Sequence, residues 1–306
     1  MDSLFVDEKL FDYTDIQLAH YIKTFPRLPE YRNIILLSPK YLAKAYHAPD
    51  LERALKATEF AFALGIPVPR VRRTVSAGGG NYCIMDRIQG AALDTEWLKL
   101  GWITSIRLAF QLRRIIRRLR SVESSTAGCL LTGQCTSFYL DDAFGLPPGA
   151  STNQVNNFLN FWQNFVSIPH EIKKTPTEHL TCPRPSFSTN DTFVYTHHDL
   201  APRNIVIDSS KQLWLVDWDY AGYYPEYFEY AGMHNFTPKG WDKLSIWRWR
   251  LLTWIACGFY GRQSSWLERI RYKFRRFPPA RRWNMTANGY AAASRRPYVD
   301  SDSDSS

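Results

Sequence analysis

The sequence predicts an α+β fold, with a small N-terminal β-sheet lobe followed by a larger, mainly helical C-terminal lobe. Strand-like segments dominate the first part of the chain, and the longest helical patterns come later. A length of 306 residues is sufficient for two lobes, each with its own core. We expect residues 1–88 to form the first lobe and residues 89–290 the second. The Ser- and Asp-rich residues 291–306 are expected to be disordered.

The N-terminal lobe is predicted from short apolar runs that are separated by turn residues. Two strands surround Ser38-Pro39, and a helix of good helix formers then ends at Gly65. The glycine-rich residues 76–81 lie between two further strands and match no phosphate-loop pattern, so they are expected to form a hairpin turn. The predicted elements are strands Ile34–Leu37 and Tyr41–Tyr46, helix Leu51–Leu64, and strands Val71–Val75 and Tyr82–Ile88.

The C-terminal lobe is predicted mainly from helical periodicity. Leu112, Ile115, Ile116 and Leu119 recur with the spacing of one helix face, and arginines occupy the opposite face. Residues 126–152 and the Pro-rich residues 172–190 are expected to be irregular. The predicted helices are residues 10–25, which precede the N-terminal sheet, then Ile103–Arg120, Asn153–Ser167 and Trp241–Phe259.

The composition narrows the possible classes of partner. Hydrophobic residues make up 45% of the chain and charged residues 22%, as in globular proteins. The net charge of +9 suits a polyanionic ligand such as ATP, but the arginine clusters carry no nucleic-acid motif, so we expect no nucleic acid partner. The most apolar stretch, residues 251–260, is too short to span a bilayer. The five cysteines are scattered without a CxxC pair, which fits a reducing, cytoplasmic location.

The strongest motif is the string HHDLAPRN at residues 197–204. It keeps the spacing of the protein-kinase catalytic loop, H-R-D-L-x-x-x-N. Two short apolar runs separated by a turn follow Asn204 and lead to Asp217. This pattern predicts a hairpin that returns Asp217 to the side of the loop.

Phosphoryl transfer explains why these residue types occur together. The reaction needs positioning and charge neutralisation more than covalent chemistry. Asp199 suits the orientation and deprotonation of an acceptor hydroxyl, while Asn204 and Asp217 offer the oxygen ligands that Mg²⁺ takes. His197 is expected to support the backbone of the loop, and His198 to be an ordinary loop residue.

The chain resembles the aminoglycoside phosphotransferase and choline-kinase-like family, especially its broad fungal branch, which has a protein-kinase-like fold. The resemblance rests on HHDLAPRNIVID, on VDWDYAGYYPEYFEY and on upstream matches at residues 65–71, 82–93 and 111–121, and it covers about residues 30–235. It implies that Lys44 grips the ATP phosphates, with Lys40 as a solvated competitor. It also implies a carboxylate partner for Lys44, either Glu52 or Glu59, and we favour Glu52.

The resemblance further implies that adenine lies against backbone groups of the connector, at Met85, Asp86 and Ile88. The chain departs from the family pattern at three places. No glycine-rich loop is visible, so the turn between the first two strands, residues 37–40, is expected to cover the phosphates. His198 stands where the family usually has Gly, and Asp219 stands where it often has Glu.

The resulting prediction is an ATP- and Mg²⁺-dependent kinase that phosphorylates a hydroxyl of a small molecule. The alternative is a catalytically inactive kinase-like module that binds a nucleotide or a partner. A protein kinase is disfavoured because no Ala-Pro-Glu segment follows Asp217. Residues 219–230 combine aromatic rings with carboxylates, so either they line an acceptor pocket sensitive to Glu226 and Glu229 or their rings fill the core. No feature indicates an obligate protein partner.

Overall fold

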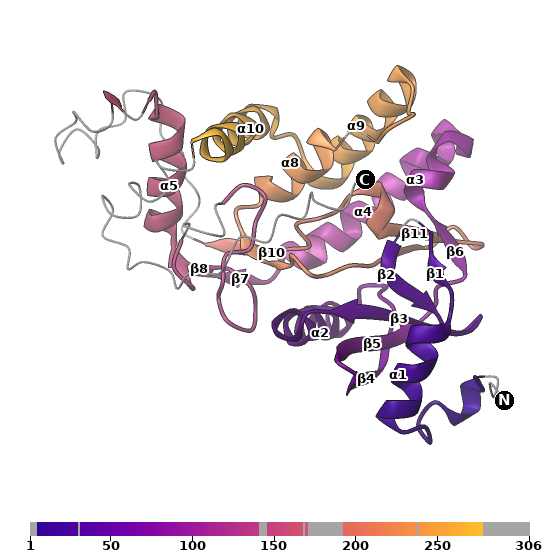
Figure 1. Ribbon diagram of the computed structural model, residues 1–306. Helices are drawn as coiled ribbons and strands as arrows, with labels where there is room; N and C mark the ends of the chain where they lie inside the picture. The colour runs from indigo at the N-terminus through magenta and orange to yellow at the C-terminus, as the bar shows by residue number, and fades with distance from the viewer. Residues whose placement is uncertain are drawn as a thin grey trace. The chain divides into compact units, whose positions relative to one another are not determined.

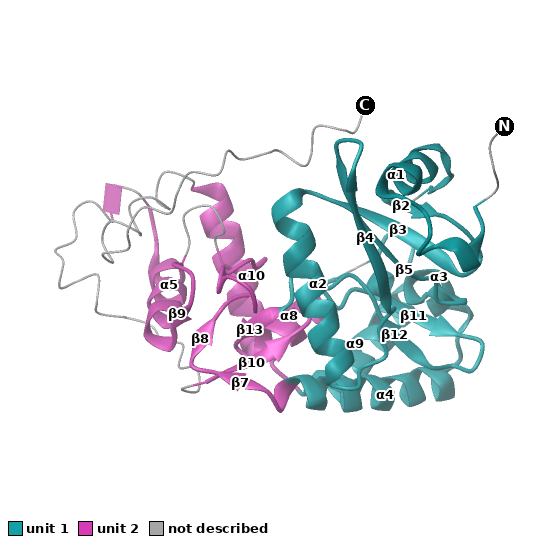
Figure 2. Cartoon of the chain, turned by 90° about the horizontal axis from the view of Figure 1, so that it is seen from below, with its two compact units in different colours: residues 1–119, 199–221, 236–258 teal, residues 120–198, 222–235, 259–306 magenta. Residues whose placement is uncertain are grey.

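The computed structural model describes residues 5–29, 31–140, 146–167, 169–170, 192–236 and 238–277. The chain forms two compact units, each built from separate stretches (Figure 2). Residues 1–119, 199–221 and 236–258 make up unit 1, and residues 120–198, 222–235 and 259–306 make up unit 2. These units do not follow sequence order, and the expected lobe boundary after residue 88 stays a prediction. The expected tail, residues 291–306, and the whole Pro-rich segment, residues 172–190, lie outside the described residues.

Unit 1 begins with a five-stranded antiparallel sheet in the order β1-β2-β3-β5-β4 (Figure 1). The hairpin between β4 and β5 turns at Gly78 and Gly79, which both have positive φ, so the glycine-rich stretch is a hairpin turn as predicted. The elements of this part are η1 (Asp7–Lys9), α1 (Asp15–Thr24), β1 (Arg27–Leu28), β2 (Tyr31–Leu36), β3 (Tyr41–Tyr46), α2 (Ala48–Ala63), β4 (Val71–Ala77) and β5 (Gly80–Asp86).

Helix α1 covers one face of this sheet. Thr14 and Gln17 form a capping box that fixes the start of the helix. Leu18 and Ile22 of α1 then pack in one core cluster with strand residues that include Ala43 of β3. Because successive strand side chains point to opposite faces, Lys44 points away from this core.

The rest of unit 1 combines a second small sheet with two long helices. The sheet has the order β12-β11-β6 and carries the hairpin predicted after Asn204. Helix α4 donates a hydrogen bond from Arg113 Nη1 to the carbonyl of Ile255 in α9, at 2.6 Å. The elements are β6 (Gly90–Ala92), α3 (Leu93–Glu96), η2 (Trp97–Lys99), α4 (Trp102–Arg120), η3 (Pro202–Asn204), β11 (Ile205–Asp208), β12 (Leu213–Leu215) and α9 (Lys243–Cys257).

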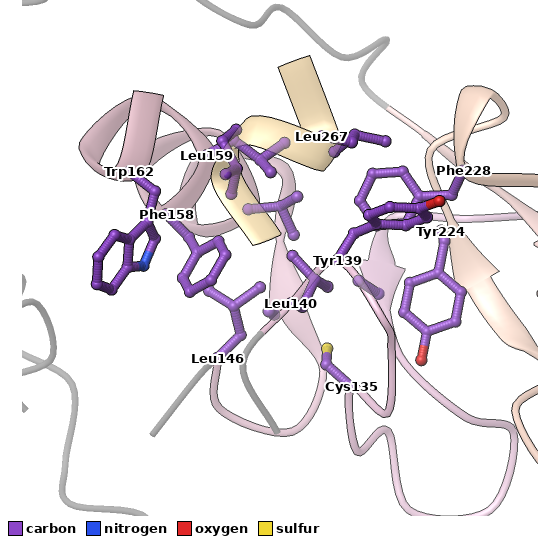
Figure 3. Close-up of a cluster of buried hydrophobic side chains, with 14 of the residues drawn as sticks. Cys135, Tyr139, Leu140, Leu146, Phe158, Leu159, Trp162, Tyr224, Phe228 and Leu267 are labelled. Carbon is purple, nitrogen blue, oxygen red and sulfur yellow. The ribbon is translucent and has the colours of Figure 1, made fainter. Parts of the chain in front are cut away.

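Unit 2 is built around an aromatic core (Figure 3). Tyr139, Phe158, Trp162, Tyr224 and Phe228 are buried in it together with aliphatic side chains. Large rings supply much apolar area per residue, which suits a unit whose strands are only two to four residues long. The elements are β7 (Glu123–Ser124), β8 (Thr126–Ala127), β9 (Ala150–Ser151), α5 (Thr152–Asn164), β10 (Phe193–Thr196), β13 (Gly222–Tyr224), α8 (Tyr227–Asn235) and α10 (Gly261–Arg276).

The predicted α+β fold class is therefore confirmed: an antiparallel sheet lies in the N-terminal part, and most of the long helices follow it. The sequence analysis missed β1, which has only two residues, and α10. In the described part of the chain, no helix is long and apolar enough to cross a membrane.

Candidate active site

Lys44 lies on β3 and makes the central ion pairs of the site. Its side chain is buried, and its Nζ lies 2.7 Å from Asp217 Oδ1 and 2.9 Å from Asp219 Oδ2. The ammonium group also lies over the ring of Tyr46, 4.7 Å from its centroid, and Tyr46 donates a hydrogen bond to Asp219 at 3.3 Å. Lys40, by contrast, is exposed, and its ion pair among the described residues is with the exposed Glu8, at 3.5 Å. The structure thus places Lys44, and not Lys40, beside Asp217.

The carboxylate partner of Lys44 differs from the one expected. Glu52 and Glu59 both lie on α2 and are exposed, and among the described residues neither forms an ion pair with Lys44. In this structure the expected Glu52–Lys44 pair is therefore wrong, since Asp217 and Asp219 occupy the ammonium group. Asp217 and Asp219 lie on one short segment after β12, where the left-handed backbone at Asp217 is followed by a turn that carries Asp219.

The catalytic-loop motif forms a compact network in unit 1. The side-chain amide of Asn204 donates to the backbone carbonyl of Asp199 and to its Oδ2, both at 2.8 Å. Arg203 donates to both carboxylate oxygens of Asp199, at 2.9 and 2.7 Å, and its guanidinium lies 5.2 Å from the ring centroid of Phe236. Arg203 was not anticipated from the sequence, although its position four residues after Asp199 could have suggested the contact.

The hairpin of β11 and β12 brings Asp217 back to this loop, as predicted. Ile205 pairs with Leu215, and the Val216 N–H then donates to the carbonyl of Asn204 at 3.0 Å. Asp217 adopts a left-handed backbone conformation with φ of 67°, which is uncommon for a residue other than glycine. Such strained conformations are concentrated at functional sites, because there a particular side-chain direction has to be enforced.

The acidic and basic groups of the site shift one another's pKa values. Burial alone would lower the pKa of Lys44, but the interactions with Tyr46, Asp217 and Asp219 more than offset burial and raise it. Burial and the charge of Asp217 raise the pKa of Asp219 to about 6. Burial also raises the pKa of Asp199, although Arg203 opposes this effect. Lys44 therefore stays cationic, and Asp199 holds a proton more readily than an ordinary aspartate does.

The two oxygen-bearing residues predicted for Mg²⁺ fit that ion. Both N–H groups of the Asn204 amide are directed to Asp199, which leaves its Oδ1 as a ligand atom, and Asp217 contributes a carboxylate. Among the described residues, no three His, Cys, Asp or Glu side chains gather as a metal cluster. Magnesium usually takes one or two protein ligands and completes its shell with water and phosphate oxygens, so two ligands are adequate.

The connector residues are largely committed to the sheet. Asp86 accepts a bidentate ion pair from Arg72 at 2.7 and 2.8 Å, and its N–H donates to the carbonyl of Arg70. The Arg87 N–H donates to the carbonyl of Lys40 at 2.7 Å. Met85 lies within β5, and Ile88 follows the strand. The Asp86 N–H and the backbone of Met85 thus take part in the sheet, and the expected contact of adenine with backbone groups at Met85, Asp86 and Ile88 stays a prediction.

The turn at residues 37–40 does not lie where a phosphate-covering loop is needed. Arg87 and Gln89 of the connector hydrogen-bond to the carbonyls of Ser38 and Pro39, so this turn sits at the connector end of the sheet. The sequence analysis took it for the first turn because β1 was missed. The chain enters β2 from β1 at Tyr31, whereas residues 37–40 follow the other end of β2. Ile34, which pairs with Lys44, lies between these two ends.

Unit 2 holds the residues just before Asp199. Glu229 is buried, and its carboxylate accepts hydrogen bonds from the N–H groups of His197 and His198, at 2.7 and 3.1 Å. Glu226 instead lies 3.7 Å from Arg120. Four rings of residues 219–230 are buried, and three of them belong to the core of unit 2. The structure therefore favours the core interpretation of this segment over the acceptor pocket.

His198 is a core residue and not an ordinary loop residue, so that expectation is wrong. Its ring stacks on Tyr224 at a centroid distance of 4.7 Å and hydrogen-bonds to Ser137 Oγ at 2.8 Å. Its φ is 69°, a left-handed value that glycine adopts without strain. This explains how His replaces the Gly of the family pattern: the backbone keeps the glycine conformation, and the ring fills space in the aromatic core.

Comparisons with known proteins identify the family of the chain. Residues 38–245 match a family model described as the phosphotransferase enzyme family. The chain is similar to the spectinomycin phosphotransferase APH(9)-Ia in complex with ADP and spectinomycin (13% identity, 82% of this chain and 79% of that one, TM-score 0.48). It is also similar to the gentamicin complex of APH(2")-IIa (13%, 92% and 96%, 0.47) and to a choline/ethanolamine kinase family protein from Mesorhizobium loti (14%, 90% and 84%, 0.43). A comparison with curated proteins gave no match.

Proposed function

The chain belongs to the phosphotransferase enzyme family, and on this premise we propose that it transfers the γ-phosphate of ATP, with Mg²⁺, to a hydroxyl group of a small molecule. One observation carries the proposal: four side chains that this reaction needs form a continuous network in unit 1. Lys44 contacts Asp217, the strand before Asp217 bonds to Asn204, and Asn204 contacts Asp199.

Each residue has one task in this proposal. Asp199 orients the acceptor hydroxyl and takes its proton, a role for which a raised pKa is suitable. Asn204 and Asp217 hold the magnesium ion, which supplies charge neutralisation at the phosphates when it is bound. Lys44 binds phosphate oxygens, and backbone groups of the connector at Met85, Asp86 and Ile88 face the adenine.

Nucleotide binding has to rearrange two ion pairs under this proposal. Lys44 forms ion pairs with two aspartates, and both carboxylate oxygens of Asp199 accept hydrogen bonds from Arg203. Phosphate oxygens can replace carboxylate oxygens on both cations, because Arg and Lys bind the two groups by the same charge-assisted hydrogen bonds. Release of Asp199 from Arg203 would free the carboxylate for the acceptor hydroxyl.

The same ion pairs favour the alternative function, a catalytically inactive module that binds nucleotide. A carboxylate that stays bound to Arg203 is a weaker base, because the ion pair favours its charged form. The two functions differ in turnover and not in nucleotide binding. We favour the enzyme because a binding module has no need for Asp199 next to a complete metal and phosphate site.

The test is magnesium-dependent ATP consumption, measured with and without a panel of hydroxyl-bearing metabolites. We expect Asp199→Asn to lower turnover by about 10²–10⁴-fold and to leave ATP affinity close to that of the wild type, since Asp199 contacts the acceptor and not the phosphates. Arg269→Ala, an exposed change on α10, serves as the control. Wild-type turnover in Asp199→Asn would refute the role of Asp199, and ATP binding without any turnover in the wild type would support the inactive module.

Cellular location is also proposed and not shown. In the described part of the chain, Cys83, Cys129, Cys135 and Cys257 are all buried free thiols. Unpaired thiols suit a reducing compartment, so we propose a cytoplasmic protein.

A further inference from the structure

Helix α4 exposes an apolar surface that the proposed phosphotransfer does not use. Its buried side is a regular stripe that packs into unit 1. Its solvent side is apolar over the first turns, where Trp102, Ile103, Ile106 and Phe110 are all exposed. Exposed apolar side chains are ordinary when they are scattered singly, but four of them on one helix face call for a partner.

Helix α9 continues this surface within the same unit. Leu244 and Trp247 are exposed on its first turns. The Trp247 ring lies 5.5 Å from that of Trp102, centroid to centroid, so the two helices present one apolar face. We call this set of residues the α4/α9 face: Trp102, Ile103, Ile106, Phe110, Leu244 and Trp247.

Basic side chains dominate the two helices of the α4/α9 face, with the exposed Asp242 capping the start of α9. Helix α4 contains six arginines and α9 three basic residues, and neither helix contains an acidic residue. Arg107, Arg114, Arg117 and Arg250 are exposed and form no ion pair within the described part of the chain. Such a face complements a partner that is both apolar and anionic.

The shape of the face decides between the possible partners. The furrow between α4 and α9 is filled by the side chains of the two helices and leaves no room for a water molecule. A partner helix needs a groove to enter, and this face offers protruding side chains instead. In a dimer through this face, the basic side chains of the two copies would repel one another. A nucleic acid backbone would contact the arginines but would leave the aliphatic side chains exposed.

We propose that the α4/α9 face docks the protein on an anionic membrane surface, without spanning the bilayer. Tryptophan side chains favour the boundary between headgroups and hydrocarbon, where one end of the ring is wet and the other apolar. Leucine and isoleucine side chains enter the acyl region beside them, and the flanking arginines bind anionic headgroups. The proposal does not depend on the reaction that the protein catalyses.

The test is flotation of the full chain with phosphatidylcholine vesicles, with and without phosphatidylserine. We expect the protein to float with the phosphatidylserine vesicles only, and to be released by high salt, because salt screens exposed charges. Ile103→Ser should weaken vesicle binding by about tenfold through loss of apolar area. Arg114→Glu should weaken it by at least about fivefold, since each basic residue near the membrane contributes about 1 kcal/mol.

The controls are matched to these variants. Ile16 on α1 is 77% exposed and Ile103 is 76% exposed, so Ile16→Ser removes an equivalent side chain from another surface. Arg269→Glu makes the same charge change on α10. Both should bind vesicles as the wild type does, and all four variants should keep its melting temperature within a few degrees.

Four results would overturn the proposal. One is no binding to phosphatidylserine vesicles, and another is equal loss in Ile16→Ser and Ile103→Ser. The third is self-association that Ile103→Ser abolishes while vesicle binding is unchanged, which would make the α4/α9 face a contact between copies. Release of the protein from vesicles by an acidic amphipathic peptide that binds tightly in solution would assign the face to a protein partner instead.

Discussion

Replacement of His198 by glycine tests how the aromatic core supports the motif. The imidazole is fully buried against Tyr224, and its Nδ1 has no hydrogen-bond partner among the described residues. Burial lowers its pKa to about 3, since the charged ring would be desolvated. The ring is therefore neutral in the folded protein, while in the unfolded chain it titrates near its ordinary pKa of 6.5.

The sign of the pH effect follows from proton uptake. Below pH 6.5 the unfolded chain binds a proton at His198 that the folded protein does not bind, so stability falls as the pH decreases from 6.5 towards 3. At pH 5 the loss is about 2 kcal/mol, which is 1.5 pH units at 1.36 kcal/mol each. At pH 7.5 the loss is negligible.

Loss of the ring has a cost that does not depend on pH. Deletion of a buried aromatic side chain typically destabilises a protein by about 3–5 kcal/mol, and an imidazole lies at the low end. Glycine adopts the left-handed conformation at this position without the strain of about 1 kcal/mol that His198 bears. The greater flexibility of glycine in the unfolded chain lowers stability by a similar amount, so the two effects cancel. We therefore expect His198→Gly to lower the free energy of unfolding by about 3 kcal/mol at pH 7.5.

The assay is urea unfolding of both proteins at pH 7.5 and at pH 5. The difference between wild type and variant should shrink from about 3 to about 1 kcal/mol, because only the wild type loses the contribution of His198. Other titrating groups cancel in this double difference. A difference that stays the same at both pH values would refute a neutral, buried His198.

Three further variants test the remaining assignments. Lys44→Ala should weaken ATP affinity by at least about tenfold and Lys40→Ala by less than about twofold, since only Lys44 is buried beside Asp217; the opposite order in calorimetry would move the phosphate grip to Lys40. Asp217→Ala should abolish the magnesium-dependent part of the thermal shift caused by ATP, and an unchanged shift would place the metal elsewhere. Glu229→Gln should destabilise unit 2 by about 2 kcal/mol, because one of its two acceptor oxygens becomes a donor that faces N–H groups; an unchanged denaturation midpoint would contradict this role.

The elements that could be predicted from the sequence are those fixed by local rules. The hairpin after Asn204 follows from two apolar runs and a turn, and it determines where Asp217 lies. The hairpin at Gly78 and Gly79 follows from glycine's freedom at positive φ. Helix α4 follows from a regular apolar stripe. In each case the information lies within a stretch of fewer than twenty residues.

The features that were missed depend on contacts between distant segments. A strand of two residues, β1, has no period to detect, and without it the turn at residues 37–40 was taken for the first turn. The burial of Glu229 depends on its partners at His197 and His198, which lie more than thirty residues earlier. A carboxylate among aromatic residues is equally compatible with a ligand pocket and with a buried acceptor of backbone hydrogen bonds. Only its partners in the folded structure distinguish the two.

The partner of Lys44 shows how this limit bears on mechanism. The sequence offers Glu52 and Glu59 as partners, but their distance from Lys44 depends on how α2 packs. Asp217 and Asp219 follow a hairpin whose end is bonded to the loop at Asn204. The ammonium group is therefore held by the segment that also carries the proposed metal ligand. A phosphate that binds Lys44 must displace a carboxylate from it, and a metal on Asp217 weakens the same ion pair. Binding of nucleotide and of magnesium is consequently expected to be cooperative, since each removes part of the cost of the other.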